Sequence, residues 1–161
     1  MIVAPLRPEQ IGEVQQPMEL GEPYISARTL SDHWLYATPF SSTCPIALTD
    51  DGTVVGAVIA FQNQDDPAEV YLQDVMTHPQ HRRRGIVRTL LQNVRSQAEA
   101  RGCRRLYLTS EPDNRAAHAS WTVLGFVNVP GNHEVAGVSV ISDFKGPGRD
   151  RAVYQLTLDQ K

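Results

Sequence analysis

A long amphipathic helix between two apolar strand patterns is the feature that most constrains the fold of this chain. Apolar residues recur at helical spacing from residue 87 to residue 98, and Gly102 follows where a helix commonly ends. Strand-like runs precede this helix at Glu69 to Thr77 and follow it at Arg104 to Thr109. Because a helix between two neighbouring strands is a crossover connection, this order predicts a parallel strand pair in a mixed α/β fold.

The other element patterns are shorter, and the first fifty residues are the least regular. Asp51-Gly52 predicts a hairpin turn, and Asp113 or Asn114 can cap a later helix. The expected strands are Ile2 to Leu6, Ile46 to Leu48, Thr53 to Gln62, Phe126 to Val129 and Val153 to Leu158, and the expected helices are Pro8 to Leu20 and one ending at Leu124. At 161 residues, the chain is expected to form one domain over residues 1–161.

Positive charge is concentrated just before and within the long helix. Residues 75–105 hold eight arginines against Glu99, a net charge of +7, whereas residues 1–74 hold 11 acids against two arginines, a net charge of −9. With the remaining residues at −1, the whole chain carries −3. This balance gives no general attraction to nucleic acid or to an anionic membrane, so the positive charge is expected to serve one local site.

The turn from Arg82 to Arg88, called the arginine turn below, has the properties of a phosphate site. The first N–H groups of a helix have no intrahelical acceptor, and Gly85 lets an anion approach the main chain there. Arg82, Arg83, Arg84 and Arg88 add side-chain charge around the same point. A solvated arginine-rich helix face is the alternative, and Arg95, Arg101, Arg104 and Arg105 are assigned to that face.

Several classes of protein and site are not indicated. The longest apolar run, Val54 to Phe61, is too short to span a bilayer, and no signal-peptide pattern opens the chain, so a cytoplasmic location is expected. Cys44 and Cys103 are expected to be buried free thiols. No histidine spacing suggests a metal site, and no ATP or dinucleotide motif is present.

Residues from about Val70 to Val129 resemble the coenzyme-binding half of the GNAT-type N-acetyltransferases. The helix start Arg82-Arg83-Arg84-Gly85-Ile86-Val87 is similar to that family's Gln/Arg-x-x-Gly-x-Gly/Ala motif. Val75-Met76-Thr77-His78-Pro79 resembles the end of its fourth strand. Asn114-x-x-Ala117 followed by Trp121-x-x-Leu124-Gly125-Phe126 resembles its later helix.

The resemblance implies a mixed, centrally splayed β-sheet flanked by helices, with acetyl-CoA as co-substrate and no metal. Backbone groups of Val75 and Thr77 would pair with the pantetheine arm, and amides of the arginine turn would hold the pyrophosphate. The implied coenzyme-binding residues are Val75, Met76, Thr77, Arg82, Arg83, Arg84, Gly85, Ile86, Val87, Arg88, Asn114, Ala117 and Trp121. A β-bulge that opens the sheet is expected near the polar pair Gln73-Asp74.

The implied reaction is direct acetyl transfer to a primary amine, which needs oxyanion donors and a proton acceptor. Asp74 is the first candidate base and Glu111 the second, and the residues do not decide between them. Asp74 can equally be a strand carboxylate that faces solvent or pairs with an arginine. Ser120 or water is a candidate proton donor to the departing thiolate, which can also leave unassisted.

Two residues depart from the family pattern. Val87 stands where the motif has Gly or Ala, and its place on the apolar stripe favours a side chain that points into the core. Trp121 stands where many members carry a tyrosine acid, and an indole cannot take that role. Trp121 is expected to pack beside Phe126.

The acceptor is the least determined part of the prediction. A small-molecule or peptide amine is expected, and the acidic surplus of residues 1–74 favours a cationic one. Trp34, Tyr36 and Phe40 are either core residues or a wall of the acceptor pocket. The segment Gly131 to Arg151 is long enough to be functional or to make a homodimer contact.

Two other functions remain open beside an N-acetyltransferase. A catalytically silent protein of the same fold would bind acyl-CoA or a protein partner as a sensor or interaction module. A phosphate-binding α/β protein unrelated to acyl transfer is the third possibility.

Overall fold

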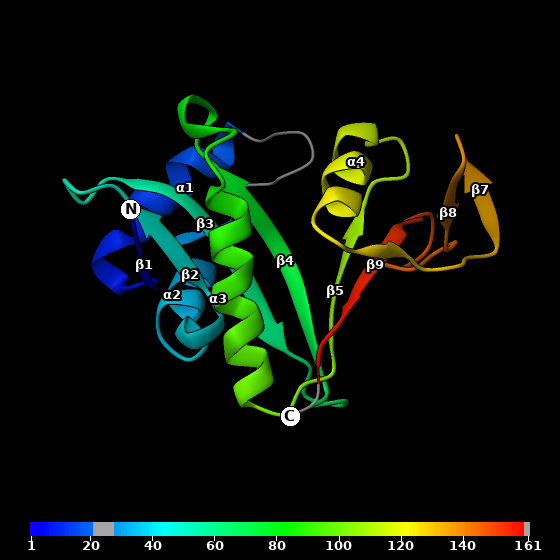
Figure 1. The fold of residues 1–161 in the computed structure, drawn as a ribbon, viewed down its shortest axis with the longest axis horizontal. Helices are drawn as coiled ribbons and strands as arrows, with labels where there is room; N and C mark the ends of the chain where they lie inside the picture. The colour runs from blue at the N-terminus through cyan, green and yellow to red at the C-terminus, as the bar shows by residue number, and fades with distance from the viewer. Residues whose placement is uncertain (21–27, 160–161) are drawn as a thin grey trace.

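A seven-stranded sheet forms the centre of the molecule (Figure 1), with strand order β1-β2-β3-β4-β5-β9-β6. The computed structural model describes residues 1–20 and 28–159. The strands of this sheet are β1 (Ile2–Pro5), β2 (Pro45–Leu48), β3 (Val54–Gln62), β4 (Glu69–Thr77), β5 (Arg105–Ser110), β6 (Val127–Asn128) and β9 (Ala152–Thr157). The parallel pair expected from the crossover helix is confirmed as β4 with β5, and the other neighbouring strands are antiparallel.

Helices cover both faces of the sheet, each over its own apolar cluster. The crossover helix α3 (Ile86–Ala100) packs on β2, β3 and β4 through Leu90, Val94 and Ala98, which are fully buried. On the opposite face, α1 (Ile11–Glu19) buries Val14 and Met18 against β3 and β4. The fourth helix, α4 (Arg115–Val123), lies beside β5, β6 and β9 (Figure 1). Figure 1 shows α3 in front of the sheet, and α1 and a further helix, α2 (Leu30–Ala37), behind it.

The first fifty residues hold one helix that the sequence did not predict. This helix, α2 (Leu30–Ala37), begins at a capping box in which Thr29 accepts from the Asp32 amide and the Asp32 carboxylate accepts from the Thr29 amide. The three aromatic residues in and after this helix differ in exposure, because Tyr36 is buried while Trp34 and Phe40 are 51% and 40% exposed. Tyr36 is thus a core residue, and the other two side chains are not.

The segment between β6 and β9 carries a second, two-stranded sheet, β7 (His133–Val135) with β8 (Val138–Val140). These two strands were not predicted from the sequence. The remaining strands and helices lie where they were expected, within a few residues. Among the described residues, no helix is both long enough and apolar enough to cross a membrane.

The sheet opens between β4 and β5. Their pairing is limited to Glu69–Leu72 with Arg105–Leu108, and β4 then continues to Thr77 without β5 beside it. The two strands diverge toward the ends that face α1 and α4, as Figure 1 shows. A bulge accompanies the divergence, because Ile59 opposes Asp74 and Ala60 opposes Leu72, which leaves Gln73 without a partner residue on β3. The expected bulge near Gln73-Asp74 is confirmed.

The bulge also changes which face the β4 side chains occupy. Before it, Leu72 packs into the cluster under α3. After it, Asp74 opposes Ile59, whose side chain belongs to the cluster under α1 and α2. Directly opposed residues share a face, so Asp74 lies on the α1 and α2 side, together with Tyr71 opposite Phe61. A regular strand would have placed Asp74 on the same face as Leu72.

Candidate active site

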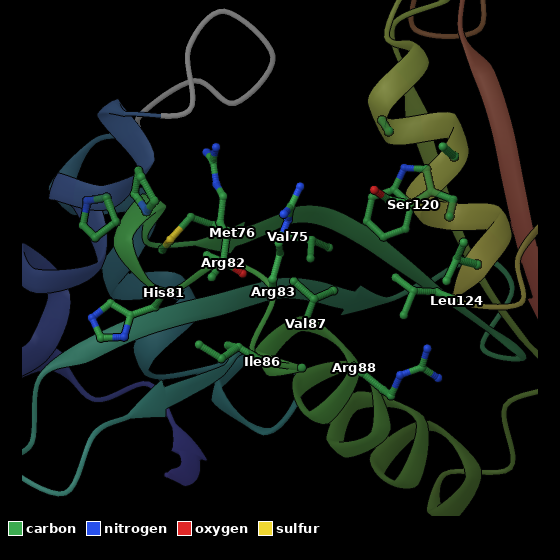
Figure 2. A pocket seen from close by; sticks show the side chains of 18 of the residues that line it. Val75, Met76, His81, Arg82, Arg83, Ile86, Val87, Arg88, Ser120 and Leu124 are labelled. Atoms are coloured by element: carbon green, nitrogen blue, oxygen red, sulfur yellow. The ribbon is translucent and has the colours of Figure 1, made fainter.

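A cavity of about 710 Å³ lies where the sheet opens, between the end of β4, the arginine turn and α4. In Figure 2, Val75, Arg83 and Val87 lie on one side of this cavity, and Ser120 and Leu124 of α4 lie on the other. Of the residues singled out in the sequence, the cavity is lined by Val75, Met76, Thr77, Arg82, Arg83, Gly85, Ile86, Val87, Arg88, Ala117, Ser120 and Trp121. Arg84, Asn114, Asp74 and Glu111 are not among its lining residues.

The turn before α3 presents main-chain N–H groups to the cavity. Arg83 and Gly85 both have left-handed backbones, with φ of 64° and 74°, so the turn is a tight loop that ends at the helix. Gly85 caps α3 without a side-chain bond, and the first helical bond runs from the Thr89 amide to the Gly85 carbonyl. The amides of residues 86–88 therefore have no helical acceptor, which is the arrangement that binds phosphate.

The arginines around this turn carry uncompensated charge. Arg82, Arg83, Arg84 and Arg88 are exposed, and in residues 1–20 and 28–159 none of them lies within salt-bridge distance of a carboxylate. Arg84 instead contacts the Nδ1 atom of His81 through Nη1, at 3.4 Å. By contrast, Arg95 on α3 pairs with Glu99, and Arg105 pairs with Glu69. The assignment of Arg105 to a solvated helix face is wrong, because Arg105 begins strand β5 and its Nε atom is buried.

The free edge of β4 offers backbone groups to the same cavity. The His78 amide bonds to the Val55 carbonyl, which makes that opposed pair a hydrogen-bonded one in the β3–β4 ladder. Bonded and non-bonded pairs alternate along antiparallel strands, so Val75 and Thr77 direct their backbone groups away from β3 and toward the opening. An extended ligand can pair with them as an additional strand.

One buried polar atom of the cavity has no partner. The hydroxyl oxygen of Thr77 is buried and makes no hydrogen bond to any of the described residues. Because Thr77 lines the cavity, a polar group of a bound ligand can satisfy that hydroxyl. The orphan hydroxyl, the open amides and the unpaired arginines together fit an elongated ligand that carries phosphate.

The position of Val87 agrees only in part with the one expected. The buried stripe of α3 consists of Ile86, Leu90, Leu91, Val94 and Ala98. Val87 flanks this stripe, so its half-buried side chain both contacts the core cluster and lines the cavity. Val87 thus contacts the core, as expected, but it also lines the cavity, because Ile86 takes the central position of the buried stripe.

Helix α4 forms the opposite wall. Trp121 packs edge-on against Phe126 with ring centroids 5.7 Å apart, as expected, and its indole N–H donates to the Ser110 hydroxyl at 3.1 Å. Ser120 is exposed on the same helix and faces the cavity. Asn114 caps the helix, accepting from the Ala117 amide, so its carboxamide oxygen serves the helix start.

Asp74 pairs with an arginine. Its side chain is only 5% exposed, and the guanidinium of Arg28 donates to both carboxylate oxygens, at 3.3 and 3.4 Å. Burial lowers the pKa of Arg28, but the hydrogen bond and the charge of Asp74 outweigh that effect and raise it above its ordinary value. Both lone-pair regions of Asp74 are thus engaged by a permanent cation.

The bulge residue is held from the α2 side. The Gln73 amide nitrogen donates to the Tyr36 hydroxyl at 2.9 Å. Burial is the main cause that raises the pKa of Tyr36, which therefore stays neutral at physiological pH. Tyr36 and Arg28, both in the irregular N-terminal part, reach the same stretch of β4.

The second candidate base lies elsewhere. Glu111 follows β5 and pairs with Arg151 at 3.2 Å, with its side chain 43% exposed. His118 is also engaged, since its Nδ1 atom lies 2.6 Å from the hydroxyl of buried Tyr154. Neither side chain lines the cavity.

Sequence reasoning missed several residues of the site. Arg28 lies 46 residues from Asp74, and no local pattern connects them. The apolar cavity wall also includes Pro17 and Leu20 at the end of α1, and Val123 and Leu124 at the end of α4, none of which was named as a site residue from the sequence. Val123 is 75% exposed although it lines the cavity, and only the position of α4 beside the cavity shows this.

Comparisons with known proteins agree with this geometry. The family model described as "Acetyltransferase (GNAT) family" matches residues 12–126. The L-2,4-diaminobutyric acid acetyltransferase of Halomonas elongata is 27% identical over 95 residues, which are 59% of this chain and 50% of that protein. That of Chromohalobacter salexigens is 31% identical over 83 residues, 52% of this chain and 43% of that protein. The matched stretches thus span half or less of these curated relatives.

Solved structures share the fold at low sequence identity. Diaminobutyrate acetyltransferase from Paenibacillus lautus, in complex with its substrate and coenzyme A, has a TM-score of 0.76 at 18% identity and covers 97% of this chain and 93% of its own. Ard1 from Thermoplasma volcanium has a TM-score of 0.78 at 14% identity, covering 99% and 98%. A putative acetyltransferase from Salmonella typhimurium with acetyl-CoA has a TM-score of 0.74 at 17% identity, covering 100% and 95%.

The family model covers well over half of the chain, and the matched residues include the bulged strand β4, the arginine turn and helix α4. This protein belongs to the GNAT acetyltransferase family.

Proposed function

We propose that this protein is an N-acetyltransferase that moves the acetyl group of acetyl-CoA directly to a primary amine. The observation that carries the proposal is the opening between β4 and β5, where a bulged strand edge meets a helix start with free amides and unpaired arginines. Acetyl-CoA complements this site, because it combines a pyrophosphate with an extended arm that can pair with a strand edge.

The chemistry follows from this placement. The pyrophosphate would lie on the turn at Arg82 to Arg88, and the pantetheine arm would run along Val75 and Thr77 toward the bulge. The amine nitrogen attacks the thioester carbon, the carbon–sulfur bond breaks, and the thiolate departs while the amine loses a proton. A main-chain amide near the bulge is the proposed donor to the carbonyl oxygen.

Asp74 and Ser120 remain the proposed proton-handling groups. Asp74 lies directly after the bulge, although Arg28 engages it. Ser120 lines the cavity on the α4 side, where its hydroxyl could donate a proton to the departing thiolate. Glu111 is a weaker candidate, because its partner is Arg151 and it does not line the cavity.

Binding without turnover is the second candidate function. Trp121 has no ionisable proton for the departing thiolate, and Val87 narrows the cavity at the position expected to face the pyrophosphate. Both residues favour a protein that senses acyl-CoA. Micromolar binding of acetyl-CoA together with no acetylation of any amine would support that function instead.

The test is acetylation of a panel of amines, followed by release of coenzyme A thiol and by mass spectrometry of the products. The first amines include L-2,4-diaminobutyric acid, on which two curated relatives act according to their names. The variant Arg88→Gln is expected to raise the KM for acetyl-CoA several-fold, whereas Arg101→Gln, at the far end of α3, leaves it unchanged. Equal effects of the two variants would contradict the proposed coenzyme site.

The same proposal includes the cellular compartment and the partners of the protein. Cys44 is a buried free cysteine, which fits a reducing compartment, and we assign the protein to the cytoplasm. The acceptor is a small molecule or a peptide amine, and nucleic acid and membranes are not proposed partners. A homodimer through residues 131–151 remains a prediction.

A further inference from the structure

A cluster of polar side chains lies on the α1 and α2 face of the opening, on the opposite side of the sheet from α3. The bulge places Asp74 on this face together with Tyr71, and Arg28 and Tyr36 reach it from the N-terminal part. The Tyr71 and Tyr107 rings lie 5.3 Å apart between β4 and β5. These residues lie where an amine would approach a thioester held against the bulge.

A second cation joins this cluster from the C-terminal part of the chain. The ammonium of Lys145 donates to the Tyr71 hydroxyl and lies 5.1 Å from the centre of its ring. In the described part of the chain, Lys145 has no carboxylate within salt-bridge distance. Its charge is therefore not compensated by a protein group in that part of the chain.

The loop that carries Lys145 is held by its own hydrogen bonds. The Lys145 amide bonds to the Arg149 carbonyl, and the Gly148 amide bonds to a carboxylate oxygen of Asp143. The Asp143 amide bonds in turn to Asp150. These bonds hold the backbone of the loop, so the position of Lys145 above Tyr71 is determined by the loop and not by the side chain alone.

Arg28 reaches the same face of β4 as this tyrosine. Its guanidinium donates to Asp74, which shares that face with Tyr71. The two cations differ in their partners, because Arg28 is paired with Asp74 whereas Lys145 contacts the Tyr71 hydroxyl and has no carboxylate partner in residues 1–20 and 28–159.

A cation without an acidic partner favours an acceptor that carries a carboxylate over one that carries only ammonium groups. We infer that the acceptor is an amino acid, whose carboxylate binds Lys145 at the Tyr71 hydroxyl while its primary amine reaches the thioester at the bulge. This inference rests on the proposed function and names the substrate class for the same site. It replaces the expectation of a purely cationic acceptor, because none of the described acids of residues 1–74 lies within salt-bridge distance of Lys145.

The first test compares amines that differ only in the carboxylate. L-ornithine is compared with its methyl ester and with putrescine, and L-lysine with cadaverine, at saturating acetyl-CoA. Each amino acid is expected to have a kcat/KM about tenfold above that of its counterparts, since a charge-assisted hydrogen bond is lost with the carboxylate. Equal or higher values for the diamines would overturn the inference while leaving acetyl transfer itself established.

Variants identify the residue responsible. Lys145→Met is expected to raise the KM for ornithine about tenfold with little change in kcat, and to leave the KM for putrescine unchanged. Lys145→Glu is expected to reverse the preference toward putrescine. Arg149→Met is the matched control, because it removes an exposed cation from the same loop and keeps the backbone carbonyl that holds Lys145. Equal effects of Lys145→Met and Arg149→Met would overturn the assignment.

A binding measurement separates this inference from the proposed function. Calorimetric titration of the coenzyme A-saturated protein with ornithine needs no turnover. Binding that Lys145→Met weakens would support the inference even in a protein that transfers no acetyl group, whereas no binding of ornithine beside clear turnover of putrescine would overturn it.

Discussion

At the scale of single residues, the two departures from the family pattern have separate consequences. Val87 lines the cavity where a smaller residue is usual, and Trp121 replaces an ionisable donor with an indole that is bonded to Ser110. In the proposed function, Val87 would affect how well the pyrophosphate fits, and Trp121 would affect the protonation of the departing thiolate. Binding and turnover can therefore change independently in this protein.

Shortening Val87 is expected to tighten coenzyme binding. In Val87→Ala, the cavity loses two methyl groups beside the helix start, and the Kd for acetyl-CoA is expected to fall several-fold. The control is Val94→Ala on the same helix, which is fully buried away from the cavity. That variant is expected to lose about 1 to 3 kcal/mol of stability without a gain in affinity. Weaker binding by Val87→Ala would contradict the position assigned to Val87.

The buried thiol of Cys44 predicts a loss of stability at high pH. Burial raises its pKa from 9.0 to about 12. Since the folded pKa lies above the unfolded value, the contribution to stability is complete below pH 9.0 and is lost as the pH rises toward about 12. Urea unfolding of the unchanged protein and of Cys44→Ala, measured at several pH values between 9.0 and about 12, tests this loss of stability. The free energy of unfolding is expected to fall more steeply with pH in the unchanged protein, and parallel slopes would contradict the prediction.

At the scale of elements, the parts with strong local periodicity were predictable. β4 has the expected bounds, α3 begins within a residue of the expected start, and the parallel pairing of β4 with β5 follows from the crossover. The polar pair Gln73-Asp74 also indicated the bulge. Helix α2 and the contact of Arg28 with Asp74 were not predictable, because they depend on long-range packing of a weakly patterned segment.

Gly56 on β3 is expected to be needed for the docking of α3. A Cβ atom at this position would lie 2.7 Å from Ile86 Cγ2 and 3.2 Å from Leu90 Cδ1, so the Ile86 side chain or the start of the helix would have to shift. Gly56→Ala is expected to cost about 1 to 3 kcal/mol of stability and to weaken acetyl-CoA binding. Gly12→Ala is the control: it meets no atom within 4 Å and is expected to stabilise α1 slightly. Thermal unfolding together with coenzyme titration distinguishes the two, and an unchanged Gly56→Ala protein would contradict the close packing.

At the scale of the whole molecule, negative and positive charges are concentrated in different parts of the chain. The excess of acids in the first 74 residues balances the arginines of the turn, so the chain as a whole stays weakly negative. The cavity beside the arginine turn, which is the proposed coenzyme site, is positive because its arginines have no acidic partners among the described residues. The sequence indicated this separation, but it did not reveal the second cluster formed by Arg28 and Lys145.

Coenzyme binding is therefore expected to depend on salt. Raising the ionic strength from about 0.1 M to about 1 M shortens the screening length from about 10 Å to about 3 Å, and the Kd for acetyl-CoA is expected to rise several-fold. A double variant, Arg82→Gln with Arg83→Gln, is expected to bind more weakly and with a smaller salt dependence. The same salt dependence in both proteins would show that other charges are responsible.

The most direct test of the coenzyme site is calorimetric titration of the protein with acetyl-CoA, beside two glycine variants. Gly85→Glu places a carboxylate at the helix start, and Gly52→Glu makes the same change at another left-handed glycine with no atom within 4 Å, in the turn before β3. We expect micromolar binding by the unchanged protein and by Gly52→Glu, and none by Gly85→Glu. Binding that survives in Gly85→Glu, or absent binding in the unchanged protein, would contradict a coenzyme site at the arginine turn.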